Sequence, residues 1–440
     1  MKGEITAFGA VGDGKTVNTE AIQAAVDRRS ESGGGRVTVP PGVFVTGTLF
    51  LKDNVELHLE AGAVLRGSPD LADYNRDDCF EQNVAFAREN VTGAHLLIAH
   101  EARNVSLTGQ GVVDGNGRAF FGDIQGGKYA IRDWRPGQMV YFCECERVRV
   151  EGVSLNNAPY WTCFLHGCEN VIVRGVSIDN PRETRNGDGI DIDCCRNVAV
   201  SDCLIASGDD CITLRASNRR LKNKDRACEH VAVSNCVLST PCNALRIGVG
   251  DGVIRNAVFS NLVVRATRNG ICLVSKYSER QTTGATIQNL RFSNLVMDTV
   301  MPFYIARGYD ATAAIENIYF SDIRATACKT SCLYGNSRGR LKNIQFRNVD
   351  VEVTGGREFM GDREPDPCVH REWSPGWDTA FFVARCDDVR FRNLTLTWSA
   401  CDAPWAHAFR LKDNGSVEID RDRLAAPPGA GAGAAVRQMD

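Results

Sequence analysis

The sequence lacks the features that mark several protein classes. It contains no run of about 18 uncharged apolar residues, the length that a membrane helix needs. It has no basic excess, because 51 Lys and Arg stand against 54 Asp and Glu, and glycine and proline (42 and 14 of 440 residues) are not enriched. We therefore expect a folded chain with neither a membrane nor a nucleic-acid partner. The first residues lack the apolar segment of a signal peptide, which predicts a cytoplasmic protein, or a secreted one if a signal has been trimmed.

Cysteine is present, but not in the pattern of a disulfide scaffold or a zinc finger. The 18 cysteines are about 4% of the chain, below the roughly 8–10% of small disulfide-rich proteins. A similar short sequence repeat begins at each of Cys168, Cys195 and Cys228. We therefore expect these cysteines to stack in a core as small apolar side chains. The pairs at 143/145 and 194/195 lack the C-x2-C spacing of a zinc site. No metal or cofactor is predicted.

A repeated phrase runs through most of the chain. Each copy has alternating apolar residues, then a Gly, Asn or Asp, then a second apolar run, as in NVIVRGVSI at 170–178 and NVAVSDCLI at 197–205. Successive copies are 23 to 33 residues apart. This is the pattern of a strand, a corner residue with left-handed backbone, and a second strand. One copy cannot bury its apolar side alone, so stacked copies predict an all-β parallel β-helix.

The repeat also predicts a ladder of stacked corner side chains and two distinct chain ends. Residues 18–26 predict a helix that caps the open N-terminal end of the solenoid. Residues 425–440, rich in Ala, Pro and Gly, predict a disordered tail, and the proline-rich stretch 357–377 predicts a long loop. We expect one domain over residues 1–424. The ladder candidates are Asn235, Asn261, Asn294, Asn348 and Asn393, with Gly175, Asp202 and Asp322 at the same corner in other coils.

Five aspartates form the most informative cluster of the chain. Asp191 and Asp193 alternate with two isoleucines, so we expect their side chains to face outward from a strand. Asp209 and Asp210 follow Asp188 by 21 and 22 residues, about one coil, which predicts that they lie beside it at about the 4.8 Å strand spacing. Like charges so close add little stability, which favours a functional site. Two carboxyls flanking a glycosidic bond suit glycoside hydrolysis; turn caps or a calcium site are the alternatives.

At these residues the sequence resembles the polygalacturonase-type glycoside hydrolases of family 28. The resemblance spans most of the chain to about residue 300, and more loosely to about 400. Besides NGDGID at 186–191 and SGDD at 207–210, it rests on FGAVGDG at 8–14, GGGRVTVPPG at 33–42, GQGVVDG at 109–115 and NAPYW at 157–161.

The resemblance implies a right-handed parallel β-helix and inverting hydrolysis of a pectin-like plant polysaccharide or oligosaccharide. It implies that Asp209 is the general acid and that Asp188 and Asp210 hold and activate the water. Asn186 matches the first residue of the family's Asn-Thr-Asp motif, whose middle position is Gly187 here. Asn186 and Asp191 are expected at the substrate cleft.

The cationic positions of the family pattern are replaced in this chain. Asn243 stands where the family has a histidine, and Cys272 and Val274 stand near the Arg and Lys that hold a uronate carboxylate. Apolar side chains cannot bind a carboxylate as a cation does. Either the substrate has no carboxylate there, or Arg246, and second Lys276, takes over; a solvated surface charge is the alternative for both. Strand alternation would turn Arg246 to the face opposite Asn243.

Aromatic residues lie one coil before the acids. Tyr160, Trp161 and His166 predict a wall against which a sugar could stack, with ordinary packing as the alternative. Three functions stay open. An inverting glycoside hydrolase is preferred, because the acidic motifs are retained. A carbohydrate-binding β-helix without catalysis would fit the missing cations, and a polysaccharide lyase would need calcium and a basic residue.

Overall fold

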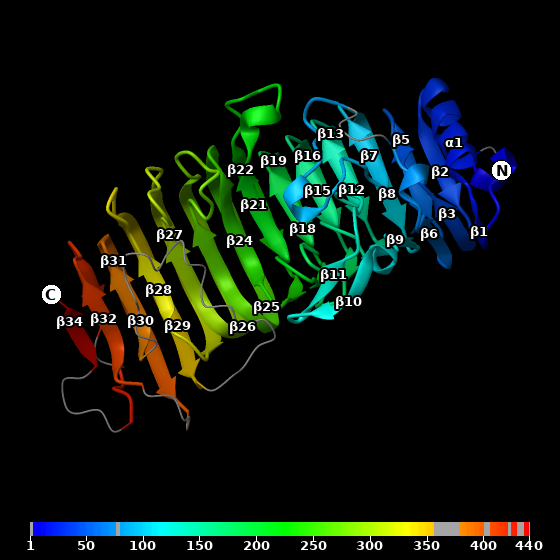
Figure 1. The fold of residues 1–440 in the computed structure, drawn as a ribbon. Coiled ribbons are helices and arrows are strands. Elements are labelled where there is room, and N and C mark those ends of the chain that lie inside the picture. Colours follow the sequence, from blue (N-terminus) through cyan, green and yellow to red (C-terminus); the bar gives the residue numbers. More distant parts are fainter. Residues whose placement is uncertain are drawn as a thin grey trace. The chain divides into compact units, whose positions relative to one another are not determined.

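The computed structural model describes residues 3–75, 80–355, 378–399, 405–420, 424–428 and 435–439. The chain divides into two compact units, Met1–Ile212 with Arg219–Arg226, and Thr213–Asn218 with Ala227–Asp440. One domain over residues 1–424 stays a prediction. Both units consist mainly of parallel strands (Figure 1). In the described part of the chain, every helix is too short or too polar to cross a bilayer.

Three strands make each coil of the first unit, and each strand pairs in parallel with its equivalents in neighbouring coils (Figure 1). The first column contains β4 (Leu49–Phe50), β7 (Leu97–His100), β12 (Val140–Cys143), β15 (Cys163–His166) and β18 (Ile190–Asp193). The second contains β2 (Gly35–Val39), β5 (Val55–Leu59), β8 (Arg103–Gly109), β13 (Glu146–Glu151), β16 (Glu169–Arg174) and β19 (Arg196–Ser201). The third contains β1 (Asp13–Val17), β3 (Gly42–Thr46), β6 (Ala63–Gly67), β9 (Val112–Asp114), β14 (Ser154–Asn156), β17 (Ser177–Asp179) and β20 (Leu204–Ala206).

The predicted N-terminal helix is present and is longer than predicted. Helix α1 (Thr19–Glu31) buries Ile22, Ala25 and Val26 and packs against β2, β4 and β5 (Figure 1). A terminal helix of this kind covers apolar groups that stacked coils would otherwise expose. Short 3-10 helices are formed by Ile5–Phe8, Leu71–Asp73, Ala87–Glu89, Gly117–Phe120 and Asn218–Arg220.

The second unit has the same parallel architecture with longer strands, several of which run through two or three sides of a coil (Figure 1). Its core contains a stack of phenylalanine rings, Phe259–Phe292–Phe320–Phe346–Phe391, with successive centroids 4.6 to 5.1 Å apart. The strands are residues 213–216 of β21 (Ile212–Ala216), β22 (Cys228–Ser234), β23 (Val237–Ser239), β24 (Asn243–Gly250), β25 (Val253–Val274), β26 (Thr286–Ala306), β27 (Ile315–Ala327), β28 (Ser331–Tyr334), β29 (Leu341–Val353), β30 (Thr379–Ala384), β31 (Cys386–Trp398), β32 (His407–Lys412), β33 (Val417–Ile419) and β34 (Val436–Met439). The fold is therefore the predicted right-handed parallel β-helix.

The C-terminal part differs from the sequence prediction at one point. Residues 425–440 were expected to be a disordered tail, but β34 lies within them and pairs in parallel with β32. Val436 and Met439, at the two ends of this strand, are partly buried, and Met439 packs against an apolar cluster of the second unit, so this segment extends the sheet despite the Gly-rich stretch before it. The long loop predicted at 357–377 lies outside the described residues.

Every predicted corner residue has left-handed backbone, with φ between 52° and 62°. In the second unit the asparagines form the predicted ladder: Asn261 Nδ2 donates to Asn235 Oδ1 (3.2 Å), and Asn294 Nδ2 donates to Asn261 Oδ1 (2.8 Å). A second ladder, which the sequence did not suggest, is formed by the asparagines that open the repeated phrases, as in Asn317 to Asn289 (3.1 Å) and Asn343 to Asn317 (2.8 Å).

We expect Asn261→Ala to lower the free energy of unfolding by about 1–2 kcal/mol, because alanine is strained in left-handed backbone and loses two amide hydrogen bonds. Asn261→Gly should cost less, since glycine accepts this backbone and loses only the hydrogen bonds. Urea denaturation of both variants measures the difference. Equal stability of the alanine and glycine variants would contradict the role of the left-handed corner.

The repeated cysteines pack inside the coils, as predicted. Cys145, Cys168 and Cys195 are buried in successive coils of the first unit, and the Cys168 N–H points at Cys195 Sγ (3.3 Å). Cys228 is buried in the second unit. Every cysteine in the described part of the chain is a free thiol. Burial raises the pKa of Cys168 well above its ordinary value, so this thiol stays protonated and packs as a small apolar group.

Candidate active site

The three aspartates predicted to be catalytic lie in the first unit, on backbone segments that are hydrogen-bonded to each other. Asp188 is preceded by Gly187, whose carbonyl accepts from the Asp209 N–H (3.3 Å), and followed by Gly189, whose N–H donates to the Asp210 carbonyl (2.8 Å). One carboxylate oxygen of Asp209 and one of Asp210 lie within 4.8 Å of each other. The one-coil spacing therefore does bring the two acidic segments side by side. The catalytic roles of the three carboxylates stay predictions.

Small residues allow these segments to approach each other. A Cβ atom on Gly208 would lie 2.5 Å from the Thr184 carbonyl oxygen, so no larger residue fits without moving the backbone. A Cβ atom on Gly187 would lie 2.8 Å from Thr184 Cγ2. The Thr184 side chain thus occupies the space beside Gly187.

The acids differ in their access to solvent. Asp188 and Asp210 are 4% and 9% exposed, whereas Asp209 is more exposed than either. The Asp209 carboxylate accepts a hydrogen bond from the Asp210 N–H (3.1 Å), and Ser207 Oγ donates to the Asp209 carbonyl (2.6 Å). These contacts hold the bend that lets two adjacent residues lie at one site, which a regular strand would not allow.

A buried arginine holds the loop that carries Asp188. Arg135 is fully buried, and its guanidinium donates to the carbonyls of Pro159 (2.9 Å) and Arg185 (2.7 Å) and to Asn186 Oδ1 (2.8 Å). Burial lowers the pKa of Arg135 to about 10, so the side chain is still cationic at neutral pH. The side-chain oxygen of Asn186, a residue predicted to bind substrate, thus accepts a hydrogen bond from Arg135. The backbone of Asn186 is left-handed (φ 52°).

A second cation holds the segment that carries Asp209. Lys128 lies on β11 (Lys128–Ile131), which forms an antiparallel hairpin with β10 (Phe121–Gln125; Figure 1). Its ammonium donates to the carbonyls of Gly208 and Arg182. The Tyr129 N–H donates to the Glu183 carbonyl (2.9 Å), which ties the same hairpin to the loop before Asn186. Sequence reasoning missed both cations, because neither belongs to a repeated phrase or a recognisable motif.

Asp191 and Asp193 are buried, although the sequence predicts that they face outward. The parallel register aligns Asp191 with Phe164 and Asp193 with His166 in the preceding coil. Phe164 belongs to a buried apolar cluster with Ile98, Tyr141 and Cys143, against which Phe80 and Trp161 pack. The side chains do leave the interior of the coil, but other side chains cover this face. Strand alternation alone cannot predict such a cover.

The predicted sugar-stacking residues are partly used for packing. Tyr160 is buried and its hydroxyl donates to Glu89 Oε2 (2.6 Å); burial raises its pKa well above the ordinary value. His166 is buried, and its Nδ1 lies 3.1 Å from the Tyr141 hydroxyl. Trp161 is partly exposed, and its ring stacks on Tyr160 with centroids 5.0 Å apart. Of the three, Trp161 has the most surface left for a ligand.

In the second unit, the replaced histidine position is part of an amide pair. Asn243 is buried, and its Oδ1 accepts from Asn269 Nδ2 (2.7 Å). Arg246 is 6% exposed; it donates to the Ile247 carbonyl (3.1 Å), and its guanidinium lies over the Tyr277 ring, 5.2 Å from the centroid. Strand pairing aligns Arg246 with Cys272 in the next coil. A cation therefore stands one coil before the position where the family has one.

The second candidate cation is already paired. Lys276 is buried, and its ammonium contacts Asp310 Oδ1 (2.6 Å) and the Thr282 carbonyl (3.2 Å). Cys272 and Val274 belong to an apolar cluster that includes Tyr304. A carboxylate at Lys276 would have to compete with Asp310.

Comparisons with known proteins agree with this fold. Residues 75–362 match the family described as Glycosyl hydrolases family 28. The chain is 31% identical to a probable polygalacturonase of Vitis vinifera over 48% of this chain and 43% of the relative. It is 27% identical to an exo-poly-alpha-D-galacturonosidase of Dickeya chrysanthemi over 91% and 72%. The solved family 28 exopolygalacturonase of Yersinia enterocolitica is 19% identical and superposes with a TM-score of 0.69 over 95% of this chain and 78% of that one, which shows a shared fold. The chain is a glycoside hydrolase that belongs to glycosyl hydrolases family 28.

Proposed function

We propose that this chain hydrolyses glycosidic bonds of pectin polygalacturonan or its oligosaccharides, with inversion at the anomeric carbon. The family supports hydrolysis, and the names of the Vitis and Dickeya relatives support galacturonan as the substrate class. The observation that carries the mechanism is the set of backbone hydrogen bonds between residues 187–189 and 209–210. They bring acid-bearing segments of two coils together, and glycoside hydrolysis needs carboxyls on both sides of the bond.

Each aspartate has a proposed role. Asp209, the most exposed of the three, protonates the oxygen of the leaving sugar. Asp188 and Asp210, both buried, hold a water molecule and remove its proton as it attacks the anomeric carbon. The arrangement requires no cofactor. Arg246 is the proposed ligand for a substrate carboxylate, because a guanidinium fork matches a carboxylate.

The test is incubation of the full chain with polygalacturonate, its methyl-esterified form and a set of neutral plant oligosaccharides. We expect new reducing ends from polygalacturonate, and proton NMR should first show the β-anomer released from the α-linked substrate. Methyl esterification removes the carboxylate and should raise KM if a cation binds it. Retention of the α-anomer at early times would contradict inversion.

The two other functions give different results in the same assay. A carbohydrate-binding β-helix would bind an oligosaccharide in calorimetry without releasing reducing ends; the loss of the family's histidine, arginine and lysine positions favours this alternative. A lyase would release an unsaturated product that absorbs in the ultraviolet, and a chelator would abolish the activity if calcium is required. Hydrolysis that persists in chelator excludes a calcium requirement at Asp209 and Asp210.

A further inference from the structure

Three potential metal ligands meet in the first unit, at the C-terminal ends of β7 and β12. His100 is the last residue of β7 and Cys143 the last of β12, and the parallel register pairs these two residues directly. Paired residues in adjacent strands point to the same face about 4.8 Å apart. Glu144 follows Cys143 with left-handed backbone (φ 50°), which breaks the alternation that would turn its side chain to the opposite face.

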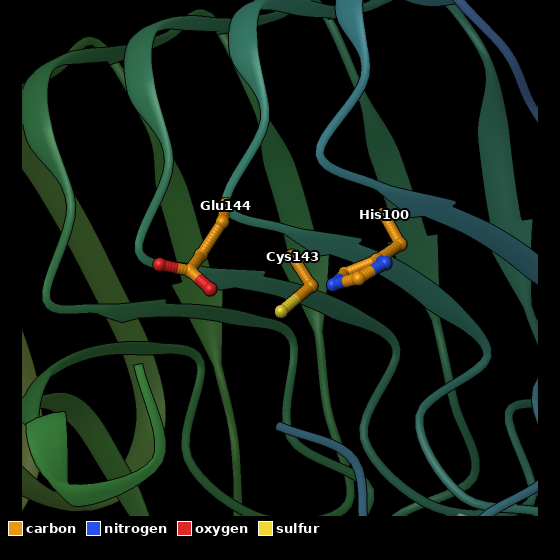
Figure 2. Close-up of side chains that lie close together, drawn as sticks. All are labelled: His100, Cys143 and Glu144. Carbon is orange, nitrogen blue, oxygen red and sulfur yellow. The ribbon is translucent and has the colours of Figure 1, made fainter. Parts of the chain in front are cut away.

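The functional ends of these side chains converge. One ligand atom each from His100, Cys143 and Glu144 lie within 4.8 Å of one another. Figure 2 shows the Glu144 carboxylate, the Cys143 sulfur and a ring nitrogen of His100 directed toward the same space. His100 Nε2 is buried and has no hydrogen-bond partner among the described residues, although Glu101 Oε1 lies 3.2 Å away. A buried polar atom without a hydrogen bond calls for an explanation, and a bound ion is one.

Neighbouring residues hold the three side chains in place. The Phe80 ring stacks on His100, with centroids 4.1 Å apart and planes 14° from parallel. Glu144 accepts from the Lys222 backbone N–H (3.0 Å) and from Gln82 Nε2. A carboxylate has about four lone-pair sites, so these two bonds leave it able to bind an ion. Partners of this kind orient metal ligands and raise metal affinity.

The exposure of these residues also suits a metal. Cys143 is fully buried, but His100 and Glu144 are partly exposed, which gives an ion a route from solvent.

We propose that His100, Cys143 and Glu144 bind one zinc ion, with water at the remaining position. Nitrogen, sulfur and oxygen together are the donors that zinc accepts, whereas calcium and magnesium take oxygen ligands. The ion would join the β7 coil to the β12 coil. The proposed zinc site does not depend on the proposed hydrolysis, because zinc binding is measured without an assay of hydrolysis. The pair Cys143 and Cys145, whose spacing does not fit a zinc site, does not form this one: Cys145 packs toward Cys168 in the core, whereas Cys143 lies close to His100 and Glu144.

The test uses the full chain, stripped with a chelator and then loaded with zinc or with cobalt as a spectroscopic probe. We expect one zinc per chain by elemental analysis after gel filtration, and a thiolate-to-cobalt charge-transfer band in the near ultraviolet. Cys143→Ser should abolish the band, and His100→Gln and Glu144→Gln should each weaken zinc binding by about tenfold or more. Calorimetry with zinc measures the affinities.

Cys145→Ser is the matched control, because Cys145 is equally buried two residues away. It should retain the cobalt band and the zinc stoichiometry. His100→Gln changes a partly exposed residue, so the proposal stays testable if a cysteine variant does not fold, and circular dichroism checks each variant. Less than one zinc per wild-type chain, a band that survives in Cys143→Ser, or loss of binding in the folded Cys145→Ser variant would each overturn the site.

Discussion

Replacing Asp209 with asparagine should lower kcat on galacturonan oligosaccharides by about 10²- to 10⁴-fold, the contribution of a general acid. Asparagine cannot give a proton to the leaving oxygen. The fold should survive, because Asp209 is partly exposed and an amide oxygen can still accept from the Asp210 N–H. Reducing-end assays give kcat, and a thermal melt verifies the fold.

Two comparisons make this result specific. Asp179→Asn changes an exposed aspartate of the same unit and should leave kcat unaltered. A substrate with an aryl leaving group, which departs without protonation, should restore much of the rate of Asp209→Asn but not of Asp188→Asn, because the latter acts on the water. Wild-type turnover by Asp209→Asn would remove this residue from the mechanism and point to another general acid.

Replacing Arg135 with methionine should have the second largest effect, on stability and on catalysis together. The change removes the hydrogen bonds to Pro159, Arg185 and Asn186 and leaves their oxygens buried without this donor. An unsatisfied buried group costs about 1–3 kcal/mol, so we expect a loss of about 3 kcal/mol in the free energy of unfolding. Asn186 precedes Gly187 and Asp188, so the acid should also lose its position.

Measurements at a temperature well below the melting point separate positioning from stability. A positioning role predicts that kcat per folded molecule falls while KM changes little, and that Arg135→Lys, which keeps the charge but not the fork, lies between wild type and Arg135→Met. Arg132→Met, which changes an exposed arginine nearby, is the control. Unaltered kcat per folded Arg135→Met molecule would show that Arg135 has a structural role only.

The corners and the core could be predicted from the sequence because they depend on local backbone preference and on alternation. Asn261 and Asn294 tolerate left-handed backbone that most residues avoid, so a repeated asparagine marks a repeated corner. The same reasoning gave the buried cysteines. Local patterns did not predict the second ladder. An asparagine at the start of a repeat has the same sequence context whether or not its side-chain amide bonds to the asparagine of the next coil.

For the site, the sequence by itself determined which acidic segments meet, because 21 to 22 residues separate Asp188 from Asp209 and Asp210 and one coil has about that length. Only the tertiary structure decided what supports and surrounds them. Arg135 reaches Asn186 across 51 positions, and His100 meets Cys143 across 43. Coil lengths vary with their loops, so the register between distant coils follows from packing and hydrogen bonding in three dimensions, which no local pattern of residues encodes.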